Sequence, residues 1–172
     1  MQAGKFINSG YAEGEAFVNV VAGASAPVTV VLKDPPEIYR RLVIRGTMSI
    51  EDYENFGDNE YATRNFARNS DLGPWDTHDE VGWTEKMGGE IRVVVSLKID
   101  LHASLSIKVD WHVAFYEGTS EETGDLDGQR SGTITVGKDE TKPLSISVWN
   151  TDEDEPEDRA DISFDLTNKM RP

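Results

Sequence analysis

The sequence predicts an all-β fold, a two-sheet antiparallel sandwich of about eight strands with jelly-roll or Greek-key connections. Three observations support this prediction: one long run of strictly alternating apolar residues, several shorter alternating runs bounded by turn residues, and no long helical periodicity. With 172 residues and no cysteine, the chain has the size of one domain without disulfides. We therefore expect a single sandwich over residues 1–172, with an immunoglobulin-like topology as the alternative.

The strongest strand pattern lies in residues 91–115, where every odd position is apolar and most even positions are polar. Period two places the odd positions on one buried face of a strand. At about 3.3 Å per residue, one straight strand of this length would outrun a domain of this size, so the run must turn or bend. We expect two arms, 91–101 and 105–115, joined at 102–104, or a bent strand shared between the sheets.

Six shorter segments complete the predicted set of strands. Residues 42–50 alternate around Gly46, which we interpret as a bulge or a position of close approach. The other five are bounded by Gly, Pro, Asp or Asn, which commonly end strands. They are residues 15–21, 28–33, 133–136, 144–149 and 161–166.

The tract 57–90 shows no strong alternation and is longer than usual loops, which run to about 12 to 15 residues. We therefore expect a long folded excursion or a functional loop here. Its best helical candidate is a turn or two in residues 61–68.

A candidate ligand site lies within this excursion, where Trp75 and Trp83 are close in sequence to Asp76 and Asp79. Aromatic faces beside carboxylates can hold sugars, through stacking on the rings and hydrogen bonds to the hydroxyls. The simpler alternative is that both tryptophans anchor the excursion to the sandwich, because tryptophan is largely buried on average.

A candidate metal site lies in residues 150–161, whose sequence NTDEDEPEDRAD has the ligand spacing of a calcium loop. Against this interpretation, Glu155 replaces the glycine of the sharp turn, and strands flank the loop; a solvated run of charges is the alternative. A second acidic turn, 121–128, contains Asp125 and Asp127 and would share ions only if it lies at the same end. The predicted ligands are Asn150, Asp152, Asp154, Asp158 and Asp161.

The net charge of -15 argues against nucleic acid and anionic membranes as partners, because like charges repel. No segment approaches the about 18 to 20 consecutive apolar residues of a spanning helix, and the start of the chain lacks the features of a signal peptide. We expect a glycan or a protein surface as partner, with oligomerisation left open. Localisation is unknown, and an extracellular or cell-surface module fits the composition.

The sequence contains none of the common nucleophile, zinc or phosphate-loop motifs, and His78, His102 and His112 have no metal-ligand spacing. We therefore expect a non-catalytic β-sandwich that acts as a binding or structural module, with calcium as its candidate cofactor. One alternative is a hydrolase acting on carbohydrate with carboxylates of residues 57–90. A second is a self-assembling or membrane-inserting β-protein, because the two arms of 91–115 have the length of membrane-spanning strands.

Overall fold

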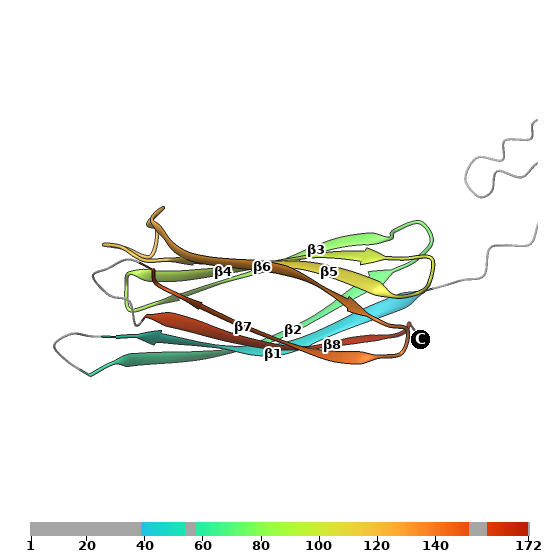
Figure 1. Ribbon diagram of the computed structural model, residues 1–172, viewed down its shortest axis with the longest axis horizontal. Coiled ribbons are helices and arrows are strands. Elements are labelled where there is room, and N and C mark those ends of the chain that lie inside the picture. Colours follow the sequence, from blue (N-terminus) through green and yellow to red (C-terminus); the bar gives the residue numbers. More distant parts are fainter. Residues whose placement is uncertain (1–38, 54–57, 152–157, 172) are drawn as a thin grey trace, which may run out of the picture. The chain divides into compact units, whose positions relative to one another are not determined.

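The computed structural model describes residues 39–53, 58–151 and 158–171, which contain eight strands and no helix (Figure 1). The predicted strands 15–21 and 28–33 lie outside the described residues, so the single domain over 1–172 stays a prediction. The strands are β1 (Arg40–Asp52), β2 (Glu60–Leu72), β3 (His78–Met87), β4 (Ile91–Leu101), β5 (Ile107–Tyr116), β6 (Leu126–Val136), β7 (Thr141–Trp149) and β8 (Arg159–Met170).

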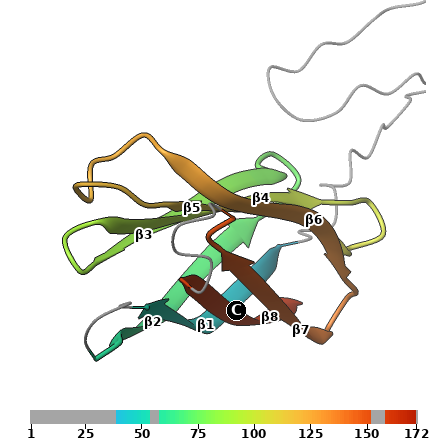
Figure 2. The same ribbon diagram turned by 60° about the vertical axis from the view of Figure 1, so that its left-hand side comes forward.

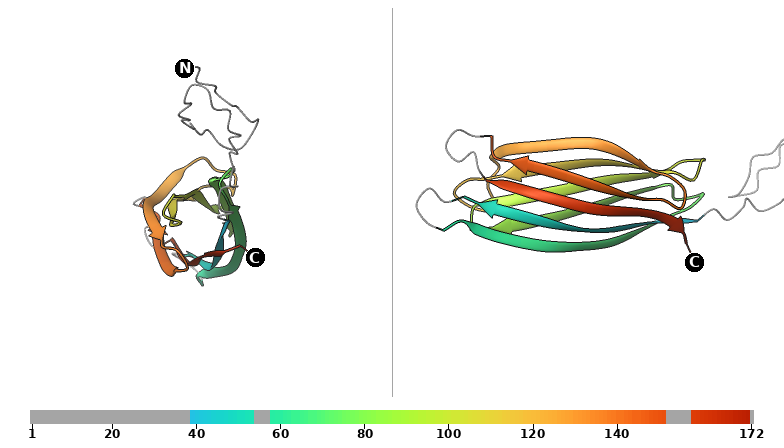
Figure 3. Two further views of the ribbon diagram at one scale, coloured as in Figure 1. Left: turned by 90° about the vertical axis from the view of Figure 1, so that its right-hand side faces the viewer. Right: turned by 60° about the horizontal axis from the view of Figure 1, so that its bottom comes forward.

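The strands form two four-stranded antiparallel sheets that face each other (Figure 2), which confirms the predicted all-β two-sheet architecture. The first sheet has the order β2-β1-β8-β7 and the second has the order β3-β4-β5-β6. Each strand follows its predecessor in an up-and-down meander, and β8 returns to pair with β1, so that the strands surround one core (Figure 3). The predicted jelly-roll or Greek-key connections were wrong, because strands hidden in residues 57–90 link the two sheets in sequence order.

The alternating run 91–115 forms a hairpin of β4 and β5, and not a bent strand shared between the sheets. Leu101 pairs with Ile107, so the connection spans five residues where we predicted three. The predicted inner face is nevertheless correct, because the predicted and the observed pairings of the two arms both join odd positions. Side chains of the predicted inner face are fully buried at Ile91, Val93, Val95, Leu97, Ile99, Ile107, Val109, Val113 and Phe115, while Leu101 and Trp111 are partly buried against the core.

Residues 57–90 consist mainly of β2 and β3, and the predicted helical turn at 61–68 was wrong. Residues 61–68 are strand because β2 pairs with β1 along its whole length, which satisfies its backbone on that side. The strand pattern was concealed because inward positions of these edge strands carry charges: Arg64 lies opposite the buried Met48, and Glu85 lies opposite the buried Val93. Arg64 Nε donates to Glu85 Oε2 over 3.2 Å.

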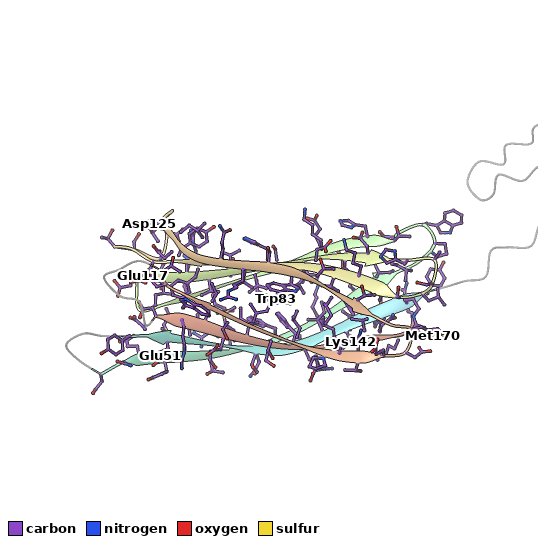
Figure 4. The ribbon with its side chains drawn as sticks, viewed as in Figure 1. Glu51, Trp83, Glu117, Asp125, Lys142 and Met170 are labelled. Atoms are coloured by element: carbon purple, nitrogen blue, oxygen red, sulfur yellow. The ribbon has the colours of Figure 1, made fainter. Side chains whose placement is uncertain are left out.

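Three aromatic rings fill the core beside β2 and β3. The ring of Trp83 lies 5.1 Å from that of Phe66 and 5.7 Å from that of Phe164, and Figure 4 shows Trp83 between the sheets. A Cβ atom added at Gly46 would lie 2.5 Å from Cδ1 of Phe164, so only glycine leaves room for this ring. This close contact confirms one of the two roles predicted for Gly46.

The antiparallel order places alternate connections at opposite ends of the sandwich. We call one end the acidic end; it carries the β1–β2, β3–β4, β5–β6 and β7–β8 connections. We call the other the paired end; it carries the β2–β3, β4–β5 and β6–β7 connections, the start of β1 and the end of β8. In Figure 4, Glu51, Glu117 and Asp125 mark the acidic end, and Met170 marks the paired end.

Candidate functional site

The two acidic connections of the sequence meet at the acidic end. The Asn150 side-chain amide donates to Glu117 Oε2 over 2.6 Å, and the Thr151 amide donates to the Asp127 carbonyl over 2.9 Å. The Glu117 amide in turn donates to Asp127 Oδ2 over 2.7 Å. The β5–β6 and β7–β8 connections therefore lie side by side, which is the condition under which we expected them to share ions.

Two further carboxylates of this end are buried. Asp158 is 0% exposed and Asp52 is 3% exposed. Asp158 Oδ1 accepts a hydrogen bond of 2.5 Å from the Tyr53 amide, and the Asp158 carbonyl accepts one of 2.9 Å from the Asn150 amide. Burying an ionised carboxylate is costly unless hydrogen bonds or a cation compensate it. The acidic end thus places two carboxyl groups away from water, and each of them is held by contacts within the protein.

The structure separates the predicted calcium ligands. Asn150 and Asp158 are buried, whereas Asp161 is exposed on the outer face of β8, where it accepts a hydrogen bond of 2.5 Å from Ser147 Oγ. Asp152 and Asp154 lie outside the described residues. Within the ranges that the structure describes, no group of three or more acidic or histidine side chains could hold a metal ion.

Basic residues at this end contact individual acids or carbonyls. Lys86 bonds Glu122 and lies 3.9 Å from Glu121, and the hydrogen bond from Lys86 lowers the pKa of Glu122 below its ordinary value. Arg92 donates to the Thr123 carbonyl over 2.5 Å. Arg159 lies 2.9 Å from Glu51. The carboxylates in these contacts are those of Glu51, Glu121 and Glu122.

The four predicted ligand residues of the 57–90 tract do not form one site. Trp83 packs in the core, so the anchoring alternative describes this tryptophan. Trp75 is 58% exposed, and it shares with the exposed Asp76 a tight turn closed between Gly73 and Asp76. Asp79 is half-buried on the inward side of β3, opposite Ile99.

A histidine–carboxylate pair that sequence reasoning missed lies on the outer face of the second sheet. His78 Nδ1 is 2.9 Å from Asp100 Oδ1, because the β3–β4 register places these residues opposite each other. This hydrogen bond is the main cause that raises the pKa of His78 above its ordinary value, with a smaller contribution from Glu80. His78 and Asp100 are 22 positions apart in the sequence, so the pair could be found only from the strand pairing.

No protein-family model matches the sequence, and no curated protein matches it. Among the described residues there is no helix that is long and apolar enough to cross a membrane. Function is therefore inferred from the geometry of the chain itself.

Proposed function

We propose that the chain is a non-catalytic β-sandwich binding module whose acidic end is stabilised by calcium. One observation carries the proposal: the β5–β6 and β7–β8 connections are joined through Asn150, Glu117 and Asp127 at the end where Asp52 and Asp158 are buried. The sequence adds five acidic residues in 152–157, between Thr151 and Asp158.

Electrostatics explains why a divalent cation suits this end. Two like charges 4 Å apart repel by about 4 kcal/mol at the effective dielectric constant of a protein surface. Calcium takes six to eight oxygen ligands in flexible geometry, so carboxylates on two adjacent connections can supply it. An ionised carboxylate has about four acceptor sites, so accepting a hydrogen bond does not prevent Asp127 or Glu117 from binding a cation.

The expected affinity is low. Glu155 stands where a calcium loop of this spacing has its turn glycine, so the connection cannot wrap an ion tightly. We expect dissociation constants of about 10⁻⁴ to 10⁻³ M, the range of weak extracellular calcium modules.

The test is thermal unfolding of the full chain in millimolar calcium chloride, compared with sodium chloride at equal ionic strength. Calcium should raise the melting temperature of the wild type, because a ligand of the native state stabilises it by mass action. The variant Asp152→Asn with Asp154→Asn should lose most of this shift. A matched control, Asp76→Asn with Asp79→Asn, removes the same charge at the paired end and should keep it.

Equal calcium shifts in the wild type and in both double variants would mean general screening of a chain with net charge -15, and the calcium proposal would fail. The carbohydrate hydrolase and the membrane-inserting protein stay predictions.

A further inference from the structure

The outer face of the first sheet is built from short polar side chains. We call it the hydroxyl face; it consists of the odd-numbered residues of β1, β2, β7 and β8, whose even-numbered neighbours mostly face the core. One row across all four strands reads Asn65, Thr47, Ser163 and Ser145. The Ser, Thr and Asn residues of the face are Thr47, Ser49, Thr63, Asn65, Asn69, Thr141, Ser145, Ser147, Ser163 and Thr167.

The hydroxyl face carries no net charge, although the chain has a net charge of -15. Its charged residues are four basic ones, Arg41, Arg45, Arg159 and Lys169, and four acidic ones, Glu51, Asp71, Asp161 and Asp165. Several of them pair on the face itself: Arg41 Nε lies 2.5 Å from Asp71 Oδ1, and Arg159 lies 2.9 Å from Glu51. A ligand on this face therefore meets hydroxyls and amides, together with equal numbers of basic and acidic side chains.

The face is hollowed near the paired end of β1 and β2. The hollow has a volume of about 310 Å³, at the lower end of the range for ligand pockets, and is lined by Val43, Ile44, Arg45, Ala67, Arg68 and Asn69. Four of these residues, Val43, Arg45, Ala67 and Asn69, belong to the hydroxyl face. Ala67 is short, and it lies opposite the long side chain of Arg45.

Two exposed aromatic residues border the hydroxyl face at the acidic end of the sandwich. Tyr61, 69% exposed, and Trp149, 42% exposed, stand at opposite ends of one row, with Glu51 and Arg159 between them. At a strand spacing of about 4.8 Å, three steps separate the two residues by about 14 Å. Tyr61 is oriented by a hydrogen bond of 2.8 Å to Glu51, and Trp149 by Arg130, whose guanidinium lies 4.4 Å from the ring centroid.

We propose that the hydroxyl face binds a neutral polysaccharide chain. Short hydroxyl and amide groups both donate and accept hydrogen bonds, as sugar hydroxyls do. Exposed rings such as Tyr61 and Trp149 offer the apolar surface on which pyranose rings stack. A neutral ligand matches a neutral face, whereas an anionic glycan is repelled by the whole chain and two copies of the chain repel each other.

The experiment is co-sedimentation of the full-length chain with insoluble cellulose and with insoluble chitin, and affinity electrophoresis in gels that contain soluble neutral glucans. The wild type should bind at least one of these polysaccharides. Ser163→Glu, which places a larger charged side chain in the centre of the face, should weaken binding at least tenfold. So should the double variant Tyr61→Ala with Trp149→Ala.

Matched controls place the same changes elsewhere. Ser131→Glu lies at an exposed position on the outer face of the second sheet, and Trp75→Ala removes an exposed tryptophan at the paired end; both should bind as the wild type does. Melting temperatures verify that each variant is folded, and Ser145→Glu replaces any face variant that is not.

Three results of the binding assay would overturn the proposal: no binding by the wild type, undiminished binding by folded face variants, or equal losses of binding in the controls. A fourth would come from sedimentation velocity, if the wild type forms a dimer and Ser163→Glu abolishes it. Calcium plays no part in this assay, so its outcome is independent of the calcium test.

Discussion

The two ends of the sandwich balance their buried charge in opposite ways. At the paired end, the buried Arg40 donates from Nε to Asn168 Oδ1 over 2.8 Å and from Nη2 to Asp139 Oδ1 over 2.7 Å. At the acidic end, the buried groups include Asp52 and Asp158, and neighbouring acids are joined through amides such as that of Asn150. Among the described residues, the buried charged side chain of the paired end is thus a cation, whereas those of the acidic end are carboxylates.

Asn168 ties the paired end together. Its side-chain amide donates to three carbonyls, those of Leu105, Val136 and Gly137, at 2.9 to 3.2 Å. One buried amide therefore links β8 to the β4–β5 connection, to β6 and to the β6–β7 turn. The comparison teaches that a buried amide organises the charged group of the paired end, whereas the calcium site that we propose at the acidic end draws on buried carboxylates.

Among the predicted effects, the largest should be the loss in the free energy of unfolding when Asn168 at the paired end is replaced. Asn168→Ala leaves the buried Arg40 guanidinium without its amide partner and removes the donor to three carbonyls. We expect a loss of about 3 to 5 kcal/mol in the free energy of unfolding, out of a total of about 5 to 15, measured by urea denaturation. As a control, Asp139→Asn changes a side chain that is 59% exposed and should cost about 1 kcal/mol or less. A cost below about 1 kcal/mol for Asn168→Ala would show that this amide does not hold the end together.

Salt should increase amide protection at the acidic end more than at the paired end, and we expect this effect to be smaller than that of Asn168→Ala. Raising sodium chloride from 0.01 M to 1 M shortens the Debye length from about 30 Å to about 3 Å, which screens repulsion among the acids. In hydrogen exchange followed by NMR, the amides of Glu117 and Thr151 at the acidic end should become several-fold more protected. The amides of Asn168 and Arg171 at the paired end, bonded to the carbonyls of Glu140 and Tyr39, serve as internal controls and should change little. An equal gain in amide protection at both ends would contradict the proposed difference between the acidic and paired ends.

The smallest effect concerns His78, whose pKa is raised above its ordinary value mainly by the hydrogen bond to Asp100. Because the folded pKa is the higher one, this contribution to stability is fully present below about pH 6.5 and is lost as the pH rises through the raised folded value. NMR titration should give His78 a pKa above the ordinary value, and Asp100→Asn should lower it. An unchanged His78 pKa in that variant would assign the shift to another cause.

The central strands could be predicted from the sequence because both of their edges are paired and most of their inward side chains are fully buried. In β4 and β5, residues such as Val95 and Val109 are 0% exposed, so the alternation is unbroken. The length of their connection could not be predicted, because Leu105 adopts a positive φ of 64°, which leucine rarely does. That connection contains no Gly, Pro, Asn or Asp, the residue types that commonly indicate a turn in a sequence.

The edge strands were harder to predict because their inward positions are not all sealed from water. In β6, Arg130 and Gly132 occupy inward positions opposite Val113 and Trp111, so the apolar pattern is visible only near the end of the strand. The predicted strand 133–136 is accordingly the last part of β6. Arg64 in β2 conceals the pattern in the same way.

The candidate sites depended on strand order, which local patterns do not contain. The sequence showed two acidic connections, but only the meander brings them to one end, where Asn150 contacts Glu117. Trp83 looked like a partner for Trp75 in sequence, yet strand parity turns Trp83 into the core. The neutral face is also a property of pairing, since its residues come from four strands.

The charged residues on the inward side of the edge strands bear on how the protein behaves when concentrated. Each edge strand has one opposite a fully buried residue: Arg64 in β2, Glu85 in β3, Arg130 in β6 and Lys142 in β7. A strand from another molecule added to such an edge would have to desolvate this charge, which disfavours fibril growth through the sheet edges. The same side chains that blur the strand pattern in the sequence therefore act as gatekeepers against aggregation.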